Sequence, residues 1–222
     1  NAYGDMELKA EWKGKTYNII YDENGGTEVA NQAYTTGEAQ TINLLTGEDI
    51  ERNGYSFSGW EITANSLTEG STITGTNKTT LSIPANDYSD INLRAIWTGN
   101  SYAIEYDTAG GQFANAYNPV ISYTTQGIAS YISINLPIDS NISRGGYLFV
   151  GWEIEVNSVP SSEIVGNNLK ITKNAYGNIK LKAIWEGGVY NISYNVNSGK
   201  WKDEYTITPV EGRIIKNKFC IS

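Results

Sequence analysis

The chain of 222 residues repeats itself, and this repetition limits its possible folds more than any other feature. The sequence MELKAEW at residues 6–12 returns as INLRAIW at 91–97 and as IKLKAIW at 179–185. The tryptophans that end these three segments are 85 and 88 residues apart. Such a regular period indicates that one supersecondary unit recurs along the chain.

Two further elements recur in the same order. The sequence YNIIYD at 17–22 returns as YAIEYD and YNISYN, and GYSFSGWEI at 54–62 returns as GYLFVGWEI. Because the sequence begins inside a repeat, we expect it to be a piece of a longer protein. The three elements together divide the chain into residues 1–14, the C-terminal strand of a preceding repeat; 15–98, repeat unit 1; 99–186, repeat unit 2; and 187–222, the start of a further, incomplete or divergent repeat with a tail.

The repeated elements have the period of a β-strand. In the last copy of the first element, Ile179, Leu181, Ala183 and Trp185 fall on one face, and mostly polar residues fall on the other. An aromatic content of 12% with 23 glycines also favours strands and turns over helices. The sequence therefore predicts a mainly β fold, α+β at most, made of small tandem units.

Other segments give weaker signals. We expect further strands near 28–35 and 40–44, and near 119–125 and 131–136 in the second copy. A short helix or 3₁₀ turn is possible at 46–52. The stretch between the Gly-Trp pair and the last strand differs in length between the copies, which is typical of an outside loop.

Composition excludes several classes of function. The chain has no histidine, the commonest general base and metal ligand, and its single cysteine, Cys220, allows no internal disulfide or thiolate metal site. A formal net charge of -8 argues against nucleic acid as a partner. No apolar run approaches the roughly 20 residues needed to span a bilayer.

The order of motifs resembles the Listeria–Bacteroides repeat family, which includes the B-repeats of internalin-type surface proteins. The motifs are an aromatic-Asp pair followed by Gly-Gly, then Gly-Tyr-x-Phe-x-Gly-Trp, then Leu-x-Ala-x-Trp, and both copies carry them. The resemblance implies β-grasp-like units in tandem on bacterial surface and secreted proteins, where they act mostly as spacers or assist adhesion. The copies here are longer than family repeats, and the tail from Tyr205 matches nothing upstream.

Most aromatic residues of the motifs are predicted to be structural. A sugar-stacking platform is the alternative for the tryptophans, but their neighbours on the same strand faces are apolar, which favours a core in each unit. The predicted core residues are Trp12, Trp60, Trp97, Trp152, Trp185, Tyr21, Tyr106, Phe57 and Phe149.

Four other aromatic residues are candidates for ligand binding. Trp201 has no counterpart in the other copies, and Tyr88, Tyr117 and Tyr131 fall in variable loops. Exposed aromatic rings in such loops are a common means of recognising a glycan or a protein.

The acidic residues suggest a calcium site and a pair of catalytic carboxylates, but a structural role is favoured over each. Asp22, Glu23, Asn24 and Glu28 offer oxygen ligands for Ca²⁺, but the second copy lacks most of them, so a turn is favoured.

Paired carboxylates are the other interpretation, since two of them can hydrolyse glycosides. Glu61 and Glu153 recur, but a partner such as Glu155 occurs in one copy only. The sequence therefore predicts no catalytic residue, no metal site and no cofactor.

We thus expect a non-catalytic stalk or spacer of an extracellular, surface-bound or secreted bacterial protein, which presents or assists adhesion. Its partners would be neighbouring repeats of the same chain. The alternative is a module that binds a host glycan or protein through exposed aromatic residues.

Overall fold

The computed structural model describes residues 4–64, 66–68, 70–127, 130–156, 159, 162–192, 197–198, 210–215 and 218–221. For residues 156, 192, 210–215 and 218–221 it describes the backbone alone. The chain divides into two compact units, Asn1–Asn100 and Ser101–Ser222.

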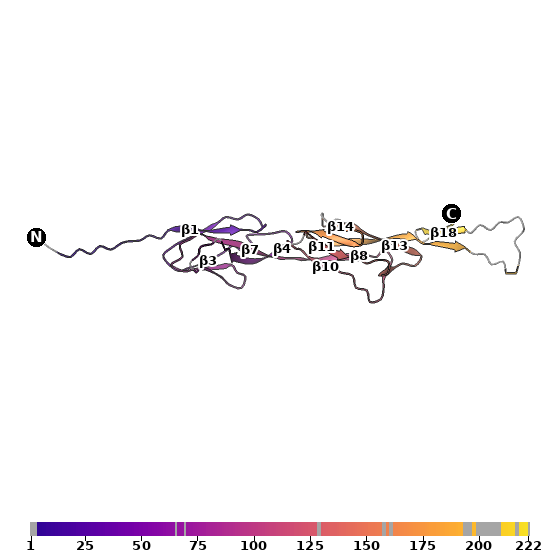
Figure 1. Cartoon of the computed structure of the whole chain (residues 1–222), viewed down its shortest axis with the longest axis horizontal. Helices are drawn as coiled ribbons and strands as arrows, with labels where there is room; N and C mark the ends of the chain where they lie inside the picture. The colour runs from indigo at the N-terminus through magenta and orange to yellow at the C-terminus, as the bar shows by residue number, and fades with distance from the viewer. Residues whose placement is uncertain are drawn as a thin grey trace. The chain divides into compact units, whose positions relative to one another are not determined.

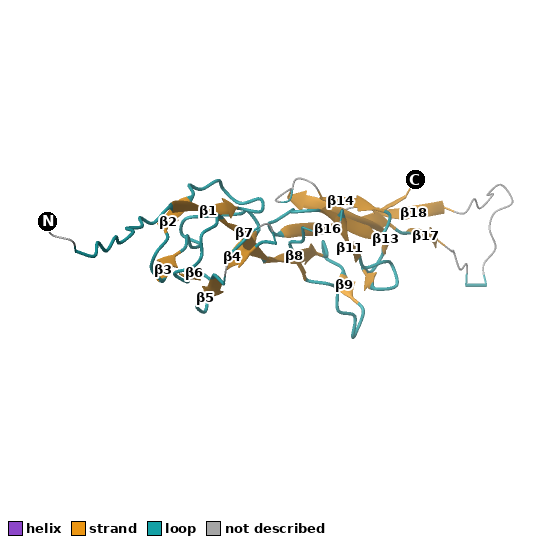
Figure 2. Cartoon of the chain, turned by 60° about the vertical axis from the view of Figure 1, so that its left-hand side comes forward, coloured by secondary structure: helices purple, strands orange, loops and turns teal. Residues whose placement is uncertain are grey.

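Unit 1 is built from two sheets (Figures 1 and 2). The larger sheet has the order β2-β1-β7-β4, in which β1 and β7 are parallel and the other pairs are antiparallel. The smaller sheet has the order β3-β6-β5. The strands are β1 (Thr16–Asp22), β2 (Gln32–Thr35), β3 (Gln40–Asn43), β4 (Tyr55–Ile62), β5 (Thr72–Thr74), β6 (Thr80–Ile83) and β7 (Ile91–Gly99).

Unit 2 repeats this plan with the orders β10-β8-β16-β13 and β11-β15-β14, and adds the short pair β12-β9. Its strands are β8 (Ser101–Asp107), β9 (Gln112–Phe113), β10 (Ser122–Thr124), β11 (Tyr131–Asn135), β12 (Ile142–Ser143), β13 (Tyr147–Val156), β14 (Ser162–Val165), β15 (Asn168–Thr172) and β16 (Ile179–Gly187). A last sheet joins β17 (Val189–Ile192), β18 (Val210–Ile215) and β19 (Lys218–Ile221).

The predicted mainly β fold is confirmed, and the described part of the chain contains no helix. The segment 46–52, expected as a possible helix, forms a turn in which Thr46 and Asp49 are hydrogen-bonded. Ile50 within this turn is buried in the core. The turn at residues 47–49 directs the Ile50 side chain into the core without a helical segment.

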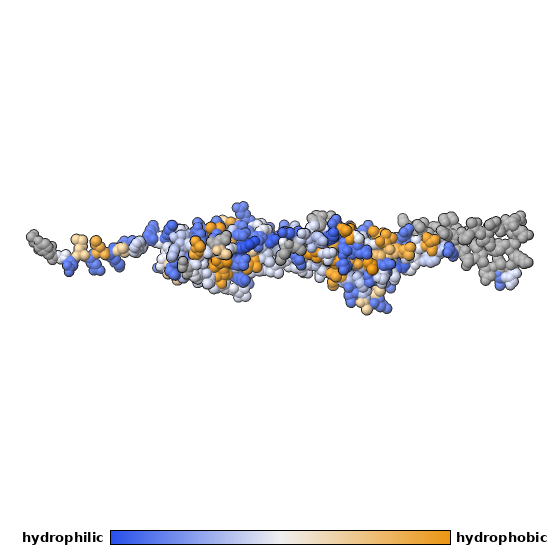
Figure 3. Space-filling view, viewed as in Figure 1, coloured by the Kyte–Doolittle hydropathy of each residue, from blue (hydrophilic) through white to orange (hydrophobic). Residues whose placement is uncertain are grey.

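Each unit encloses its own core between its two sheets. In unit 1, Ile19, Leu93 and Trp60 of the larger sheet form one buried cluster with Leu81 and Ile83 of β6. The matching cluster in unit 2 contains Ile104, Leu181, Trp152, Leu169 and Ile171. Hydrophobic side chains also remain exposed among polar ones on the surface of both units (Figure 3).

The stretch after the Gly-Trp pair was expected to be an outside loop, and this expectation is wrong. It contains the β5–β6 hairpin in unit 1 and the β14–β15 hairpin in unit 2. Leu81, Ile83, Leu169 and Ile171 in these hairpins are at most 1% exposed. In β6 and β15 the alternation is only two apolar residues long, too short to distinguish a strand from a loop by period alone.

The segment before β1 differs from the copies that follow. Residues 4–15 form no strand, and Met6, Leu8 and Trp12 are 84%, 87% and 93% exposed. The expected core position of Trp12 is therefore not observed. Its counterparts pack because β7 and β16 lie between two strands of their own unit, and no described strand flanks residues 4–15.

Candidate functional site

In each unit, an aspartate side chain stabilises the turn that follows the first strand. The Oδ1 atom of Asp22 accepts the backbone N–H of Asn24 at 2.9 Å, and Asp107 accepts that of Ala109 at 2.8 Å. This is the turn role expected for the aspartates. Asn24 and Ala109 have positive φ angles of 50° and 48°, which the turn imposes and the following glycine continues.

A tryptophan from the last strand closes over this turn. The Nε1–H groups of Trp97 and Trp185 donate to the carbonyl oxygens of Glu23 and Thr108, each at 2.9 Å. A Cβ atom on Gly26 would lie 2.6 Å from Cζ2 of Trp97, and one on Gly111 would also overlap its tryptophan. The second glycine of the motif is thus required by the indole ring that lies on it.

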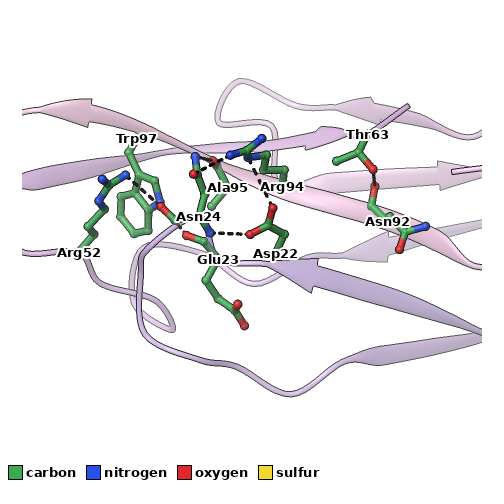
Figure 4. A network of polar contacts seen from close by, with 9 residues as sticks. All are labelled: Asp22, Glu23, Asn24, Arg52, Thr63, Asn92, Arg94, Ala95 and Trp97. Atoms are coloured by element: carbon green, nitrogen blue, oxygen red, sulfur yellow. Dashed lines mark hydrogen bonds and ion pairs between the residues drawn. The ribbon is translucent and has the colours of Figure 1, made fainter. Parts of the chain in front are cut away.

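Polar side chains tie the turn of unit 1 to the rest of the sheet (Figure 4). Nη1 of Arg52 donates to the carbonyl oxygen of Asn24 at 3.0 Å. The amide of Asn24 donates to the carbonyl of Ala95 and accepts from Nη2 of Arg94, both at 3.0 Å. Arg94 also lies 3.5 Å from the carboxylate of Asp22. We call Asp22, Asn24, Arg52, Arg94 and Trp97 the turn clamp.

The turn clamp leaves little for a cation to bind. Glu23 accepts the backbone N–H of Val29 at 2.9 Å, and the Asp22 carboxylate already has two partners. In the parts of the chain that the structure describes, no three His, Cys, Asp or Glu side chains form a group that could hold a metal ion. The positive charges of two arginines beside the turn also disfavour a cation there.

The central tryptophans are buried in the core of each unit. Trp60 is 0% exposed and Trp152 8% exposed, and their Nε1–H groups donate to the carbonyls of Leu45 and Pro137 at 2.7 and 2.8 Å. Other predicted core residues, half-buried except for the buried Tyr21, surround them: Tyr21 and Phe57 in unit 1, and Tyr106 and Phe149 in unit 2.

Trp97 and Trp185 are half-buried against the same cores, each beside a phenylalanine. Burial raises the pKa of Tyr21 and Tyr106 to about 12. These aromatic residues therefore belong to the packing of each unit.

Unit 1 contains a fully buried carboxylate that was not predicted from the sequence. Asp87 is 0% exposed and accepts hydrogen bonds from the hydroxyls of Ser71 and Ser89. The Tyr34 hydroxyl lies 3.4 Å from Oδ1 of Asp87 and donates its proton to the carbonyl oxygen of Ser89 at 2.7 Å. Burial first, and then the charge of Asp87, raise the pKa of Tyr34 to about 12. Ala175 takes this position in unit 2. A single loop aspartate without a counterpart looks like a solvated residue in sequence, so only the fold reveals its burial.

The acids considered for glycoside hydrolysis lie on the outer face of the larger sheets. Glu61 is opposite Arg94 on β7, and Glu153 is opposite Lys182 on β16. Glu155 lies 2.8 Å from Nζ of Lys180 and 3.9 Å from that of Lys182. Each acid is beside a cation on an exposed sheet face, which is the arrangement of surface charge pairs.

The binding candidates occupy different environments. Tyr88 is 60% exposed and Tyr131 48% exposed. Tyr131 does not lie in a loop as expected, because it begins β11 and pairs with Thr172 of β15, and Nζ of Lys170 is 5.0 Å from its ring. Tyr117 is half-buried, with its ring 5.9 Å from that of Phe113. Trp201 lies outside the described residues.

An exposed tyrosine at a position shared by the two units was missed. Tyr176, 45% exposed, lies three residues before Ile179, as Tyr88 does before Ile91. Counting back from the last strand in both copies would have found the pair.

Comparison with known proteins agrees with the motifs. The Listeria-Bacteroides repeat domain matches residues 17–82 and 102–181, more than half of the chain. The chain belongs to this repeat family. The resemblance drawn from the three ordered motifs is thereby confirmed, and each match falls within one of the two structural units.

Two relatives come from Evansella cellulosilytica. A protein named "Putative Gly-rich membrane protein" is 28% identical over 160 residues, 70% of this chain and 17% of the relative. A "Putative membrane protein" is 24% identical over 226 residues, 92% of this chain and 30% of the relative. The repeat chain thus spans less than a third of either relative. No solved structure is significantly similar to it. No helix among the described residues is long and apolar enough to cross a membrane.

Proposed function

We propose that this chain is a non-catalytic repeat region of a bacterial surface or secreted protein, and that it acts as a spacer which presents or assists an adhesive part. The membership of the repeat family and the relatives named as membrane proteins support a place at the cell envelope. The large parts of the relatives that lie outside the match leave room for other domains.

The observation that carries the spacer role is the direction of the first and last strands. In unit 1, β1 is parallel to its neighbour β7, and in unit 2, β8 is parallel to β16. A chain that comes in along one strand and goes out along a parallel neighbour leaves the unit at the opposite end. Each unit therefore adds the length of its strands to the path of the chain, at about 3.3 Å per residue.

The spacer role is tested by changing the number of repeat units and the sequence of a unit in separate variants. A reporter epitope is fused beyond the chain, and the fusion is displayed on a bacterial surface and probed with an antibody. Deletion of residues 99–186 joins Thr98 to Gly187, a position equivalent to Gly99, and should reduce access to the epitope. As the control, unit 2 is replaced by a second copy of unit 1, which should preserve access. Equal access after the deletion, or loss of access in the control, would overturn the proposal.

A binding module that uses exposed aromatic residues is the second candidate. It is favoured by Tyr88 and Tyr176, which stay exposed at the same position in both units and contribute nothing to either buried core. Multivalently displayed chain would be tested on host matrix proteins, with Tyr88→Ser and Tyr176→Ser together as the variant. Saturable binding that both substitutions abolish supports this function, and binding that they leave unchanged contradicts it.

A further inference from the structure

The two units differ in the loop of one hairpin. In unit 1, residues 75–79 connect β5 to β6, whereas in unit 2 only Gly166 and Asn167 connect β14 to β15. A two-residue hairpin loop is the shortest common connection, so unit 2 has the minimal form. The longer loop of unit 1 is an addition that the repeat fold does not require.

The longer loop lies against the edge of β4. The backbone N–H of Trp60 donates to the carbonyl oxygen of Lys78 at 3.1 Å. A Cβ atom on Gly59 would overlap the carbonyl oxygen of Asn77, whereas one on Gly151, the matching residue of β13, would have no atom within 4 Å. Gly59 is thus the residue that allows the loop to approach the strand.

This contact creates a groove in unit 1. The groove has a volume of about 450 Å³ and lies between the 75–79 loop, the turn at Thr46 and the strand β4. Its lining side chains are uncharged: the hydroxyls of Thr46, Ser58, Thr76 and Thr79, the amide of Asn77 and the half-buried ring of Phe57.

Two of the lining positions are apolar in unit 2. Leu45 and Pro137 accept the indole N–H of equivalent tryptophans, so Thr46 corresponds to Ile138, which is 38% exposed. Ser58 corresponds to Val150, which is 59% exposed. These two hydroxyl groups of the groove therefore belong to unit 1 and are not inherited from the repeat.

Several polar groups in the groove are available to a ligand. Within the described chain, the side chains of Thr76, Asn77 and Thr79 make no hydrogen bond. The Ser58 hydroxyl has one hydrogen bond, to Thr98 at 2.6 Å. The Thr46 hydroxyl donates to Asp49 at 3.2 Å and accepts the backbone N–H of Glu48 at 3.3 Å. Each hydroxyl oxygen has capacity for one further hydrogen bond. The Phe57 ring, packed edge-on against Trp60 and Trp97, is held in a fixed orientation.

We propose that this groove binds a neutral carbohydrate. A sugar presents hydroxyl groups that both donate and accept, which hydroxyl and amide side chains match, and C–H faces that pack on an aromatic ring. The absence of charged groups among the lining side chains disfavours phosphate and other ionic ligands. The volume lies at the lower end of the range of small-molecule sites and suits one or two sugar rings. This binding goes beyond the spacer role and does not depend on it.

The test is a titration of the full chain with a panel of neutral mono- and disaccharides, followed by amide NMR. A binding sugar should shift the signals of residues 46–47 and 75–79 in a saturable way. Asn77→Ala should weaken its affinity about three- to tenfold, the value of one neutral hydrogen bond. The matched control is Asn167→Ala in the hairpin loop of unit 2, which should leave the affinity unchanged.

A second variant separates loss of binding from loss of fold. Residues 75–79 are replaced by Gly-Asn, the loop of unit 2, which should abolish the shifts while tryptophan fluorescence still reports a folded core. Tyr88→Ser should retain binding, which distinguishes the groove from the exposed aromatic residues. The proposal is overturned if the folded chain binds no sugar of the panel at millimolar concentration. It is also overturned if binding survives the loop exchange.

Discussion

The two units share a core and a turn but differ where the chain passes between strands. Both place a tryptophan over a Gly-Gly turn and bury a second tryptophan at the centre of the core. Unit 1 alone has the long β5–β6 loop and the buried Asp87, whose place in unit 2 is taken by Ala175. The difference teaches that the repeat constrains the residues that touch both sheets, and leaves the hairpin loop and the loop before the last strand free to change.

The largest effect is expected at the central tryptophans. Trp60→Ala should reduce the free energy of unfolding of unit 1 by about 3–5 kcal/mol, because the side chain is buried and leaves a cavity. Trp152→Ala should do the same to unit 2. Differential scanning calorimetry would measure both variants. If either substitution lowers every transition equally, the two units unfold as one cooperative body and the comparison between them fails.

The turn glycines give the next largest effect. Gly26→Ala and Gly111→Ala should each cost about 1–3 kcal/mol, since the added methyl group overlaps Trp97 or Trp185. Chemical denaturation followed by tryptophan fluorescence would measure the loss. Gly4→Ala is the control, because nothing lies within 4 Å of its Cβ position. Equal and small losses at all three positions would show that the indole rings move aside.

A smaller effect is expected at Asp87, where the units differ. Asp87→Ala gives unit 1 the residue of unit 2 and removes the acceptor of the Ser71 and Ser89 hydroxyls. The lost hydrogen bonds destabilise the unit, but the loss of a buried carboxylate offsets part of the cost, so we expect about 1 kcal/mol. Asp87→Asn retains an acceptor oxygen and should cost less in the same denaturation experiment. A stabilising Asp87→Ala would mean that desolvation of the carboxylate outweighs its hydrogen bonds.

The smallest expected effect is the change in the free energy of unfolding near pH 10 that comes from buried tyrosine hydroxyls. Burial raises the pKa of Tyr34 in unit 1 and Tyr123 in unit 2 from 10 to about 12. Because the pKa is higher in the folded state than in the unfolded state, the folded state loses the phenol proton only at a higher pH. The stabilisation is therefore complete below pH 10 and is lost as the pH rises towards 12.

Denaturant midpoints across this pH range would measure the loss. Tyr34→Phe should make the pH dependence of unit 1 less steep, and Tyr123→Phe should do the same for unit 2. Some dependence should remain, because the pKa of Tyr21 and Tyr106 is also raised to about 12. A midpoint that rises between pH 10 and 12 would contradict the sign.

The repeat, the strands and most of the core could be predicted because each depends on local pattern. The alternation around Trp97 and Trp185, and the apolar residues on the same faces, predicted buried strands correctly. The sequence could not predict the β5–β6 hairpin. Leu81 and Ile83 are buried only because the hairpin packs against the larger sheet, whose strands come from distant parts of the sequence.

The groove and Asp87 lay beyond sequence reasoning for a related physical reason. Asn77 meets Gly59 across a long sequence separation, and Ser71 meets Asp87 in the same way. Neither contact has a counterpart in unit 2 from which it could have been predicted. Sequence comparison of the two copies therefore predicts what they share, and the three-dimensional contacts are needed to interpret what they do not.

The parallel neighbours β1 and β7 also determine how a unit bears tension. The two strands pair from Ile19 with Ile91 to Asp22 with Arg94, and they carry the chain into and out of the unit. A pull on both ends would slide these strands past each other, so that the hydrogen bonds between them are loaded together and not broken one after another. A region that holds an adhesive part against flow would gain mechanical resistance from this arrangement of strands.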